Sequence, residues 1–279
     1  MFEKILIANR GEIAVRIIRA ARELGIATVA VYSEADQDAL HTMLADEAVC
    51  IGPARSTESY LNMNNIISAA IVTGAQAIHP GFGFLSENSK FATLCEEVGI
   101  KFIGPSAKVM DTMGDKINAR AEMIRAQVPV IPGSDGEVYT SEEALAIADK
   151  IGYPVMLKAS AGGGGKGIRK VERAEDLVTA FENASSEAQA AFGNGAMYME
   201  RVIYPARHIE VQILADQHGH VIHLGERDCS LQRNNQKVLE EAPSIAIGHT
   251  LRNKIGEAAV RAAASVGYEN AGTIEFLLD

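Results

Sequence analysis

Short apolar runs alternate with helical patterns through the first hundred residues. The run KILIA at 4–8 is typical of a buried parallel strand, and the segment EIAVRIIRAARELG after it is typical of an amphipathic helix. Further apolar runs begin at residues 28, 47, 77 and 101, with helical patterns around 57–73 and 86–98. This alternation of strands and helices predicts a doubly wound parallel sheet.

The pattern changes after Pro105. Residues 106–126 have the pattern of two short helices broken near Gly114, and a connector rich in proline and glycine follows at 128–136. A second unit comes next. Its predicted elements are a helix at 141–151, strands at 154–160 and 167–171 on either side of a glycine run, a helix at 173–191 and a strand at 196–203.

The last segment is rich in strands. Residues 208–216 and 220–226 flank a QHGH turn and predict a hairpin, while 249–266 predicts a helix and 272–279 a final strand. The most polar stretch, 225–243, is predicted to be a long loop that bears a site, because its mixed charges lie between apolar elements. A chain that stops at the end of a strand leads us to expect a truncated domain.

Composition narrows the class of protein. The chain has 279 residues, 47% of them hydrophobic and 22% charged, which is ordinary for a soluble protein of two domains or parts of domains. The net charge of −10 disfavours nucleic-acid and anionic-membrane partners. Three widely spaced cysteines, no signal-peptide pattern and no long apolar stretch together predict a cytoplasmic protein.

The glycine run at 160–167, SAGGGGKG, is the first candidate for chemistry. It is not a Walker A loop, because Ser160 stands where that motif needs glycine and Gly167 where it needs serine or threonine. Nor is it a dinucleotide fingerprint, because a strand-like IRKV follows instead of a helix. On its own, the run fits a flexible linker and a phosphate-binding turn equally well.

Charged residues inside apolar strands are further candidates. Lys158 ends an apolar strand, where a lone ammonium needs an anion. Glu200 lies in the segment MERVI, where its carboxylate either faces solvent or accepts a hydrogen bond from the amino group of a nucleotide base. Glu275 lies in GTIEFLLD and either faces water or binds a hard cation. Lys116 begins a helix and, judged alone, is a solvated surface lysine. His218, His220 and His223 cluster at the predicted hairpin. The polar character of the turn explains the first two, and a zinc site is disfavoured.

Ordered motifs along the whole chain resemble the biotin carboxylase family: KILIANRGEIAVRIIRAARELG, AIHPGFGFLSEN, FIGPS, MGDK, KASAGGGGKGIR, RHIEVQIL, GERDCSLQR, QKVLEEAP and AGTIEFL. The resemblance implies an α/β protein with a Rossmann-like (pre-ATP-grasp) N-terminal domain followed by an incomplete ATP-grasp fold. The implied divisions are the N-terminal domain at 1–113, linker helices and the ATP-grasp lid at 114–203, and the start of the C-terminal ATP-grasp domain at 204–279.

The resemblance also implies a ligase reaction. ATP and bicarbonate give carboxyphosphate, and the carboxyl group passes to N1′ of biotin on a carrier protein, which is the first half-reaction of acetyl-CoA carboxylase in fatty-acid synthesis. Such phosphoryl transfer depends on positioning and on charge neutralisation around Mg²⁺, with Mn²⁺ as a possible replacement. The implied substrates and cofactors are therefore ATP, Mg²⁺, bicarbonate and carrier-bound biotin.

The family's functional residues map onto this sequence position by position. Lys237 matches the catalytic lysine that holds bicarbonate, and Glu275 matches one magnesium carboxylate. Asn235 departs from the histidine of many relatives, but its amide can still contact a ribose hydroxyl. The implied nucleotide-binding residues are Lys116, Lys158, Gly162, Gly163, Gly164, Gly165, Gly167, Glu200, Arg201, Val202, Ile203, His208, Gln232, Asn235, Glu275 and Leu277. We also expect the glycine loop to be mobile without nucleotide.

Partners follow from the same resemblance. It implies a biotin carboxyl carrier protein, carboxyltransferase subunits and a homodimer, with no nucleic acid and no membrane. Arg16, Arg19 and Glu23 match dimer-interface positions, although ordinary solvation explains a polar helix face equally well. The segment HPGFGFLSEN at 79–88 resembles the loop near the biotin end.

The sequence departs from the family at its end and leaves alternatives open. The family continues with E-x-N-x-R-x-Q-V-E-H, which supplies a second metal carboxylate, an arginine and a base, so we expect these 279 residues alone to lack carboxylase activity. The biotin carboxylase domain of pyruvate carboxylase, or of another acyl-CoA carboxylase, is an alternative. A non-catalytic nucleotide-binding or dimerisation module is a second. A dehydrogenase is set aside because ANRGEIA contains a single glycine.

Overall fold

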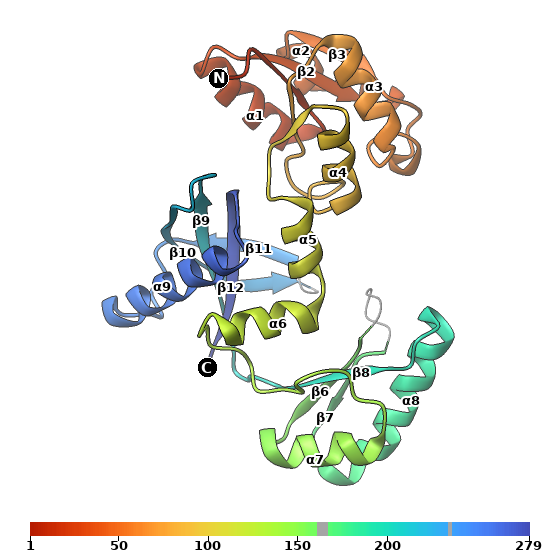
Figure 1. Ribbon diagram of the computed structural model, residues 1–279, viewed down its shortest axis with the longest axis vertical. Coiled ribbons are helices and arrows are strands. Elements are labelled where there is room, and N and C mark those ends of the chain that lie inside the picture. Colours follow the sequence, from red (N-terminus) through yellow and green to blue (C-terminus); the bar gives the residue numbers. More distant parts are fainter. Residues whose placement is uncertain (161–166, 234–235) are drawn as a thin grey trace. The chain divides into compact units, whose positions relative to one another are not determined.

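The computed structural model of the chain describes residues 1–160, 167–233 and 236–279, and only the backbone at residue 116 (Figure 1). The chain forms two compact units. One comprises residues 1–112 with 215–219 and 267–271, and the other comprises 113–214, 220–266 and 272–279. The division of the chain into three domains stays a prediction. Among the described residues, no helix is long and apolar enough to cross a membrane.

The first unit contains the parallel sheet that the sequence predicted. Its strand order is β3-β2-β1-β4-β5, and every pairing is parallel. Strand β1 is buried on both faces: Leu6 packs into one hydrophobic cluster, and Ile5 and Ile7 into another. The strands are β1 Lys4–Ile7, β2 Ala27–Tyr32, β3 Glu47–Cys50, β4 Ala77–His79 and β5 Lys101–Phe102.

Helices cover both faces of this sheet, and two of them, α3 and α4, begin at asparagine caps. The Asn62 side chain accepts a hydrogen bond from the backbone N–H of Asn65, and Asn88 does the same for Phe91. Helix α1 buries Ile17 and Ile18 and exposes its arginines, as its periodicity predicted. The helices are α1 Gly11–Glu23, α2 Leu40–Leu44, α3 Met63–Thr73 and α4 Ser89–Glu97, with short 3-10 turns at Glu34–Asp36 and Ser56–Glu58.

Two helices, α5 Ala107–Gly114 and α6 Lys116–Arg125, follow the parallel sheet in sequence. The predicted break near Gly114 is confirmed. Its local cause is Asp115, whose carboxylate accepts hydrogen bonds from the N–H groups of Ile117 and Asn118, both at 2.9 Å, and so starts a new helix.

A three-stranded antiparallel sheet of order β7-β6-β8 packs against α7 and α8 in the second unit (Figure 1). The outer edge of β8 is not bare, because Gly133 bridges to Glu200 and Val138 to Met197. The elements are α7 Ser141–Ile151, β6 Val155–Ala159, β7 Arg169–Val171, α8 Ala174–Phe192 and β8 Met197–Arg201.

A four-stranded sheet of order β11-β10-β9-β12 lies against α9 in the same unit. The prediction of a loop at 225–243 is wrong, because strands β10 and β11 occupy most of that stretch. Charges are tolerated there because they are paired: the buried Glu226 accepts from Nε of Arg252 at 2.7 Å, and Asp228 accepts from Ser244. The elements are β9 Arg207–Ala215, β10 Val221–Arg233, β11 Gln236–Glu241, α9 His249–Ser265 and β12 Asn270–Leu278.

Candidate functional site

A polar stripe runs along one face of β9, within the four-stranded sheet. His208, Glu210 and Gln212 alternate with residues 209, 211 and 213, all three of which are buried apolar side chains. Successive side chains of a strand point to opposite faces, so the three polar groups share one face. Glu210 is only 4% exposed and must therefore find partners within the protein.

Those partners come from the neighbouring strands. The Glu210 carboxylate accepts a hydrogen bond from Nε of Arg227 on β10 at 2.5 Å and another from Nζ of Lys237 on β11. Lys237 also donates to Oε1 of Glu275 on β12 at 2.6 Å. The Lys237 ammonium thus lies between two carboxylates contributed by strands far apart in the sequence.

The electrostatic state of this group follows from the pairing. Burial disfavours the Lys237 ammonium, but its hydrogen bonds to Glu210 and Glu275 outweigh burial and hold the pKa of Lys237 above its ordinary value. Burial also disfavours the Glu210 carboxylate, and the bonds from Lys237 and Arg227 outweigh it in turn, so the pKa of Glu210 lies below its ordinary value. Lys237 is therefore a fixed cation at neutral pH.

We expect the paired Glu210 to make the protein sensitive to acid. Its folded-state pKa lies below the ordinary 4.5, so the carboxylate stabilises the fold above that value. This stabilisation is lost as the pH falls through the lowered pKa. Glu210→Gln should flatten the dependence of the unfolding free energy on pH between about pH 6 and pH 3. Urea unfolding at several pH values measures it, with the exposed Glu257→Gln as the control; equal slopes in both variants would refute the expectation.

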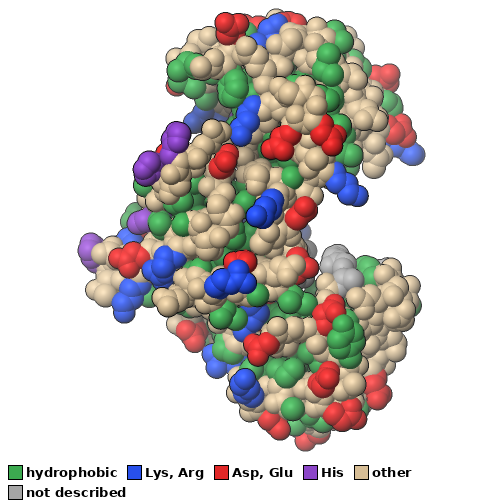
Figure 2. All heavy atoms as spheres, viewed as in Figure 1, with side chains coloured by type: hydrophobic (Ala, Val, Ile, Leu, Met, Phe, Trp, Pro, Cys, Tyr) green, Lys and Arg blue, Asp and Glu red, His purple; other side chains and the backbone are tan. Residues whose placement is uncertain are grey.

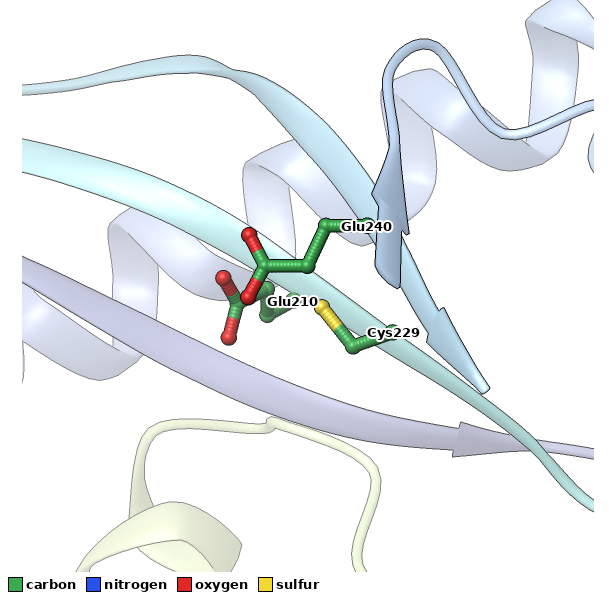
Figure 3. A group of neighbouring side chains, drawn as sticks. All are labelled: Glu210, Cys229 and Glu240. Carbon is green, nitrogen blue, oxygen red and sulfur yellow. The ribbon is translucent and has the colours of Figure 1, made fainter. Parts of the chain in front are cut away.

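Cys229 and Glu240 complete the surroundings of Glu210 (Figure 3). The potential ligand atoms of Glu210, Cys229 and Glu240 lie within 4.8 Å of one another, but they suit a cation poorly. Burial, with the nearby Glu210 and Glu240, raises the pKa of the Cys229 thiol to about 11, so the thiol keeps its proton. Glu210 already binds two cationic side chains, which leaves it little capacity for a metal ion.

Glu275 suits a hard cation better. Its side chain is 61% exposed, and the hydrogen bond from Lys237 goes to Oε1, so Oε2 is available to a ligand. A carboxylate oxygen on an accessible strand face is the type of ligand that Mg²⁺ prefers. The fit supports Glu275 as a metal carboxylate.

The other predicted residues of this sheet flank the same group. Gln232 is the register partner of Lys237, and its Nε2 donates to the carbonyl of Cys229 at 3.0 Å. His208 lies two residues before Glu210 and donates its backbone N–H to the Ser230 hydroxyl at 3.0 Å. Leu277 follows Glu275 by two residues, with its side chain 39% exposed. Four strands thus bring most of the predicted residues of the segment 204–279 onto neighbouring positions.

A second group lies on the three-stranded sheet. The Lys158 ammonium donates to the Glu200 carboxylate across the β6–β8 pair, so the anion that the sequence required for Lys158 is found on the adjacent strand. Backbone groups of residues 201 and 202 are held as well: N–H of Arg201 bonds to Pro132 and that of Val202 to Pro154, both at 2.8 Å. Beyond β8, Val202 and Ile203 are half-buried.

Gly167 is the described part of the glycine run. Its φ is +67°, and a Cβ there would lie 2.9 Å from Cβ of Ala159, so the packing requires glycine. Its carbonyl accepts from the N–H of Ala159 at 3.0 Å, which closes the β6–β7 hairpin. Gly162, Gly163, Gly164, Gly165 and Asn235, the side chain of Lys116 and the expected mobility of the loop lie outside the described residues.

Sequence reasoning missed Glu210 as a site residue and treated Arg227 as one charge of a crowded loop. A signal for Glu210 existed, because RHIEVQIL alternates polar and apolar residues with the period of a strand. That alternation places an acid on the same face as His208. Without the pairing of β9 with β10, however, nothing in the sequence assigned a partner to it.

A parallel-sheet unit followed by two antiparallel sheets with paired lysines and carboxylates is the architecture of an ATP-grasp protein. Residues 115–279 match the family described as carbamoyl-phosphate synthase L chain, ATP binding domain. Residues 1–110 match the family described as biotin carboxylase, N-terminal domain. The chain belongs to the biotin carboxylase family, as its motifs implied.

Named relatives agree with these matches. The chain is 58% identical over 279 residues to biotin carboxylase 1 of Bacillus subtilis (strain 168), covering 100% of this chain and 62% of the relative. A biotin carboxylase–beta-gamma-ATP complex from Campylobacter jejuni matches with a TM-score of 0.92 and 55% identity, over 100% of this chain and 63% of that one.

A third match is the biotin carboxylase domain dimer of 2-oxoglutarate carboxylase from Hydrogenobacter thermophilus, in complex with MgADP, ADP and bicarbonate. Its TM-score is 0.89 and its identity 54%, and the match covers 100% of this chain and 61% of that one. The chain spans about 62% of the length of biotin carboxylase 1 of Bacillus subtilis.

Proposed function

We propose that the protein is a biotin carboxylase, an ATP-dependent ligase that carboxylates biotin on a carrier protein at the expense of ATP and bicarbonate. The observation that carries the proposal is Lys237, a fixed cation between the buried Glu210 and the accessible Glu275. A small anion such as bicarbonate needs a positioned cation of this kind, because the protein as a whole is negatively charged.

The roles of the surrounding residues follow from their chemistry. Lys237 binds and orients bicarbonate, so that an oxygen of the anion attacks the γ-phosphorus of ATP and gives carboxyphosphate and ADP. Mg²⁺, when bound, neutralises the phosphate charge, and the free oxygen of Glu275 would hold it. The carboxyl group then passes from carboxyphosphate to N1′ of biotin, which loses its proton, and inorganic phosphate leaves. Arg227 and Glu210 keep Lys237 in place and are positioning residues.

The nucleotide has its own set of proposed contacts. Lys158 and Lys116 bind the phosphates, and Lys158 must then exchange its present contact with Glu200 for a phosphate oxygen. That exchange frees the Glu200 carboxylate to accept from the adenine amino group. The remaining proposed contacts are Gly162 to Gly165, Gly167, Arg201, Val202, Ile203, His208, Gln232, Asn235 and Leu277.

The acceptor of the second half-reaction is proposed to be acetyl-CoA, which places the protein in fatty-acid synthesis with a biotin carboxyl carrier protein and carboxyltransferase subunits. A keto-acid carboxylase is the alternative, because one relative comes from a 2-oxoglutarate carboxylase. We further propose a cytoplasmic protein. On the face shown in Figure 2, Lys and Arg side chains are scattered among acidic ones, which supports local recognition of small anions over binding to a polyanion.

An assay of the full-length protein tests the proposed function. ATP hydrolysis should require bicarbonate and Mg²⁺, and added biotin should acquire ¹⁴C from labelled bicarbonate. Labelled carboxybiotin is the decisive product, since many ATP-binding proteins hydrolyse ATP slowly. ATP binding without bicarbonate-dependent turnover would instead favour the non-catalytic nucleotide-binding module.

A homodimer through α1 is part of the proposal. Arg16 and Arg19 line a cavity of about 410 Å³ with Leu40 and His41, and among the described residues neither arginine has an ion-pair partner. Leu40, which lines the same cavity, is 56% exposed, and Met43 of the same helix is 67% exposed. Unpaired cations beside exposed apolar side chains suit a protein interface. Glu23, on the same exposed helix face, would contribute to it.

Arg19→Glu should weaken self-association at least about tenfold, because a reversed charge at an interface repels the group that the arginine bound. Sedimentation velocity over a range of concentrations measures the change. Lys90→Glu, an exposed charge reversal on α4, serves as the matched control. If both variants dimerise like the unmodified protein, the interface does not lie at α1.

A further inference from the structure

Arg120 lies on α6, one helical turn after Lys116, and is half-buried. Its Nη1 donates a hydrogen bond to the backbone carbonyl of Ile131, in the connector that follows α6. Its Nε is buried and has no hydrogen-bond partner among the described residues. Withdrawing a guanidinium from water is costly, and an arginine on a helix surface is ordinarily solvated. The burial of Arg120 therefore needs an explanation beyond the helix itself.

The connector at 131–134 lies along the edge strand β8. The N–H of Ser134 donates to the carbonyl of Met199 at 2.7 Å. A Cβ at Gly133 would lie 2.6 Å from the same carbonyl oxygen and 3.2 Å from the Tyr198 hydroxyl, so only glycine allows this close approach. The connector is therefore fixed to β8, and a hydrogen bond from α6 to its first carbonyl links the helix to that strand.

Tyr198 gives α6 a second contact with β8. The Tyr198 side chain is buried, and Arg120 donates a hydrogen bond to its hydroxyl. Burial raises the pKa of Tyr198, while the charge and the hydrogen bond of Arg120 act in the opposite direction. One guanidinium thus joins α6 to a carbonyl of the connector and to a side chain of β8. A planar group with several donors suits such a double contact, whereas a lysine ammonium is a single point of charge.

Tyr198 shares a face of the three-stranded sheet with the Lys158–Glu200 pair. Tyr198 and Glu200 are two residues apart on β8, and the register partner of Tyr198 on β6 is Lys158. The methionines on either side of Tyr198 belong to the hydrophobic core on the opposite face. Arg120 therefore ties α6 to the face of β8 that carries the proposed contacts of the nucleotide.

The end of α6 packs against other elements. Met123 lies against a buried cluster formed by Val128 and two alanines of α9, and Phe276 of β12 packs against the same cluster. Strand β12 also carries Glu275, the proposed metal carboxylate. Helix α6 therefore connects elements that hold different parts of the proposed nucleotide site, and Arg120 is its link to the three-stranded sheet.

We propose that Arg120 is a positioning residue of the nucleotide site. It ties α6, which carries Lys116, to β8, which carries Glu200, and so sets the spacing of the groups that receive the phosphates and the base of ATP. The nucleotide assignment rests on the proposed function, whereas the tie rests on the contacts of Arg120 alone. A preformed site loses little entropy on binding, so loosening the tie weakens ATP binding without removing a group that touches the nucleotide.

Calorimetric titration of the full-length protein with MgATP measures this role. Arg120→Met keeps the length of the side chain but removes its donors, and should raise Kd for ATP about tenfold at an unchanged binding stoichiometry. Arg120→Lys keeps the charge and one donor group, and should raise Kd about threefold. KM for bicarbonate should stay within about twofold in both variants. A variant with fewer binding sites and an unchanged Kd would show loss of folded protein only, and would contradict the positioning role.

Tyr198→Phe tests whether the two contacts form one tie. Removing the hydroxyl should raise Kd for ATP about threefold, and adding Tyr198→Phe to Arg120→Met should raise it no further, because the hydrogen bond is already lost. Fully additive effects would show that Tyr198 and Arg120 act separately, and would overturn the tie to β8.

The matched control is Arg261→Met. Arg261, on α9, also donates to a backbone carbonyl, that of Gln127 at 3.4 Å, directly after α6 and before the stretch that lies along β8. This variant should keep Kd for ATP within about twofold. An equal rise of Kd in Arg261→Met and Arg120→Met would mean a general loosening of the segment after α6, and the proposal would be overturned.

Amide hydrogen exchange measures the tie without nucleotide. The N–H groups of Ser134 and Arg201, which join the connector to β8, should exchange about tenfold faster in Arg120→Met. Faster exchange with an unchanged Kd would show a tie that does not serve the nucleotide, and unchanged exchange would show that Arg120 does not hold the connector; either result overturns the proposal. An unmodified protein that binds ATP but never carboxylates biotin would refute the proposed function, while the Kd values would still decide the positioning role.

Discussion

Lys237→Gln should abolish bicarbonate-dependent turnover while ATP binding survives. The ammonium is held between Glu210 and Glu275, and glutamine of similar length can offer a hydrogen bond but no charge to a bound anion. Loss of a charged group directed at a reacting anion typically lowers turnover about a thousandfold. ATP binding depends on other residues, so it should change by less than about threefold. Labelled carboxybiotin formation and ATP titration measure the two effects.

A loss of turnover in Lys237→Gln can be told apart from a loss of folding. Glu210 keeps its 2.5 Å hydrogen bond to Arg227 when Lys237 is replaced, so the buried carboxylate is not left without a partner. Lys254→Gln, an exposed lysine on α9, is the matched control and should retain full turnover. If Lys237→Gln loses ATP binding and turnover to the same degree, Lys237 belongs to the nucleotide site and not to a bicarbonate site.

Glu275→Gln should increase the Mg²⁺ concentration needed for half-maximal activity at least about tenfold. The amide keeps an oxygen but loses the negative charge that attracts a hard cation, and its Oε1 no longer forms an ion pair with Lys237. Activity measured against Mg²⁺ at saturating ATP and bicarbonate gives the value. High Mg²⁺ should restore much of the lost rate, which a folding defect would not allow.

The exposed Glu257→Gln on α9 is the control for Glu275, since it removes one charge from the same unit without touching the polar stripe. Its Mg²⁺ dependence should match that of the unmodified protein. A Glu275→Gln variant with the same Mg²⁺ titration as this control would contradict the assignment of Glu275 to the metal.

Local sequence signals predicted most of the elements. The helix expected at 141–151 is α7 Ser141–Ile151, because Thr140 caps it and Gly152 ends it. The helix break near Gly114 and the parallel strands of the first unit were predicted as well, since caps, glycines and apolar periodicity act within a few residues of one another. These features need no knowledge of distant contacts.

The loop predicted at 225–243 shows where that reasoning ends. Charge density suggested a long loop that bears a site, yet β10 and β11 cross the stretch. Arg227 pairs with Glu210 from β9, and Glu226 pairs with Arg252 from α9, so each charge is offset by an element far away in the sequence. A strand can hold such charges only when the partners are in place, and no local pattern reveals them.

The sequence by itself determined the class of each unit, the family and the residue types of the site: lysines and carboxylates within apolar strands. Tertiary structure decided which of them meet. It set Lys237 between Glu210 and Glu275, joined Lys158 to Glu200, and placed Arg120 beside the carbonyl of Ile131. The physical reason is that propensity and periodicity act over one or two turns of chain. Burying a charge, in contrast, is favourable only beside a specific partner, and strand pairing supplies that partner.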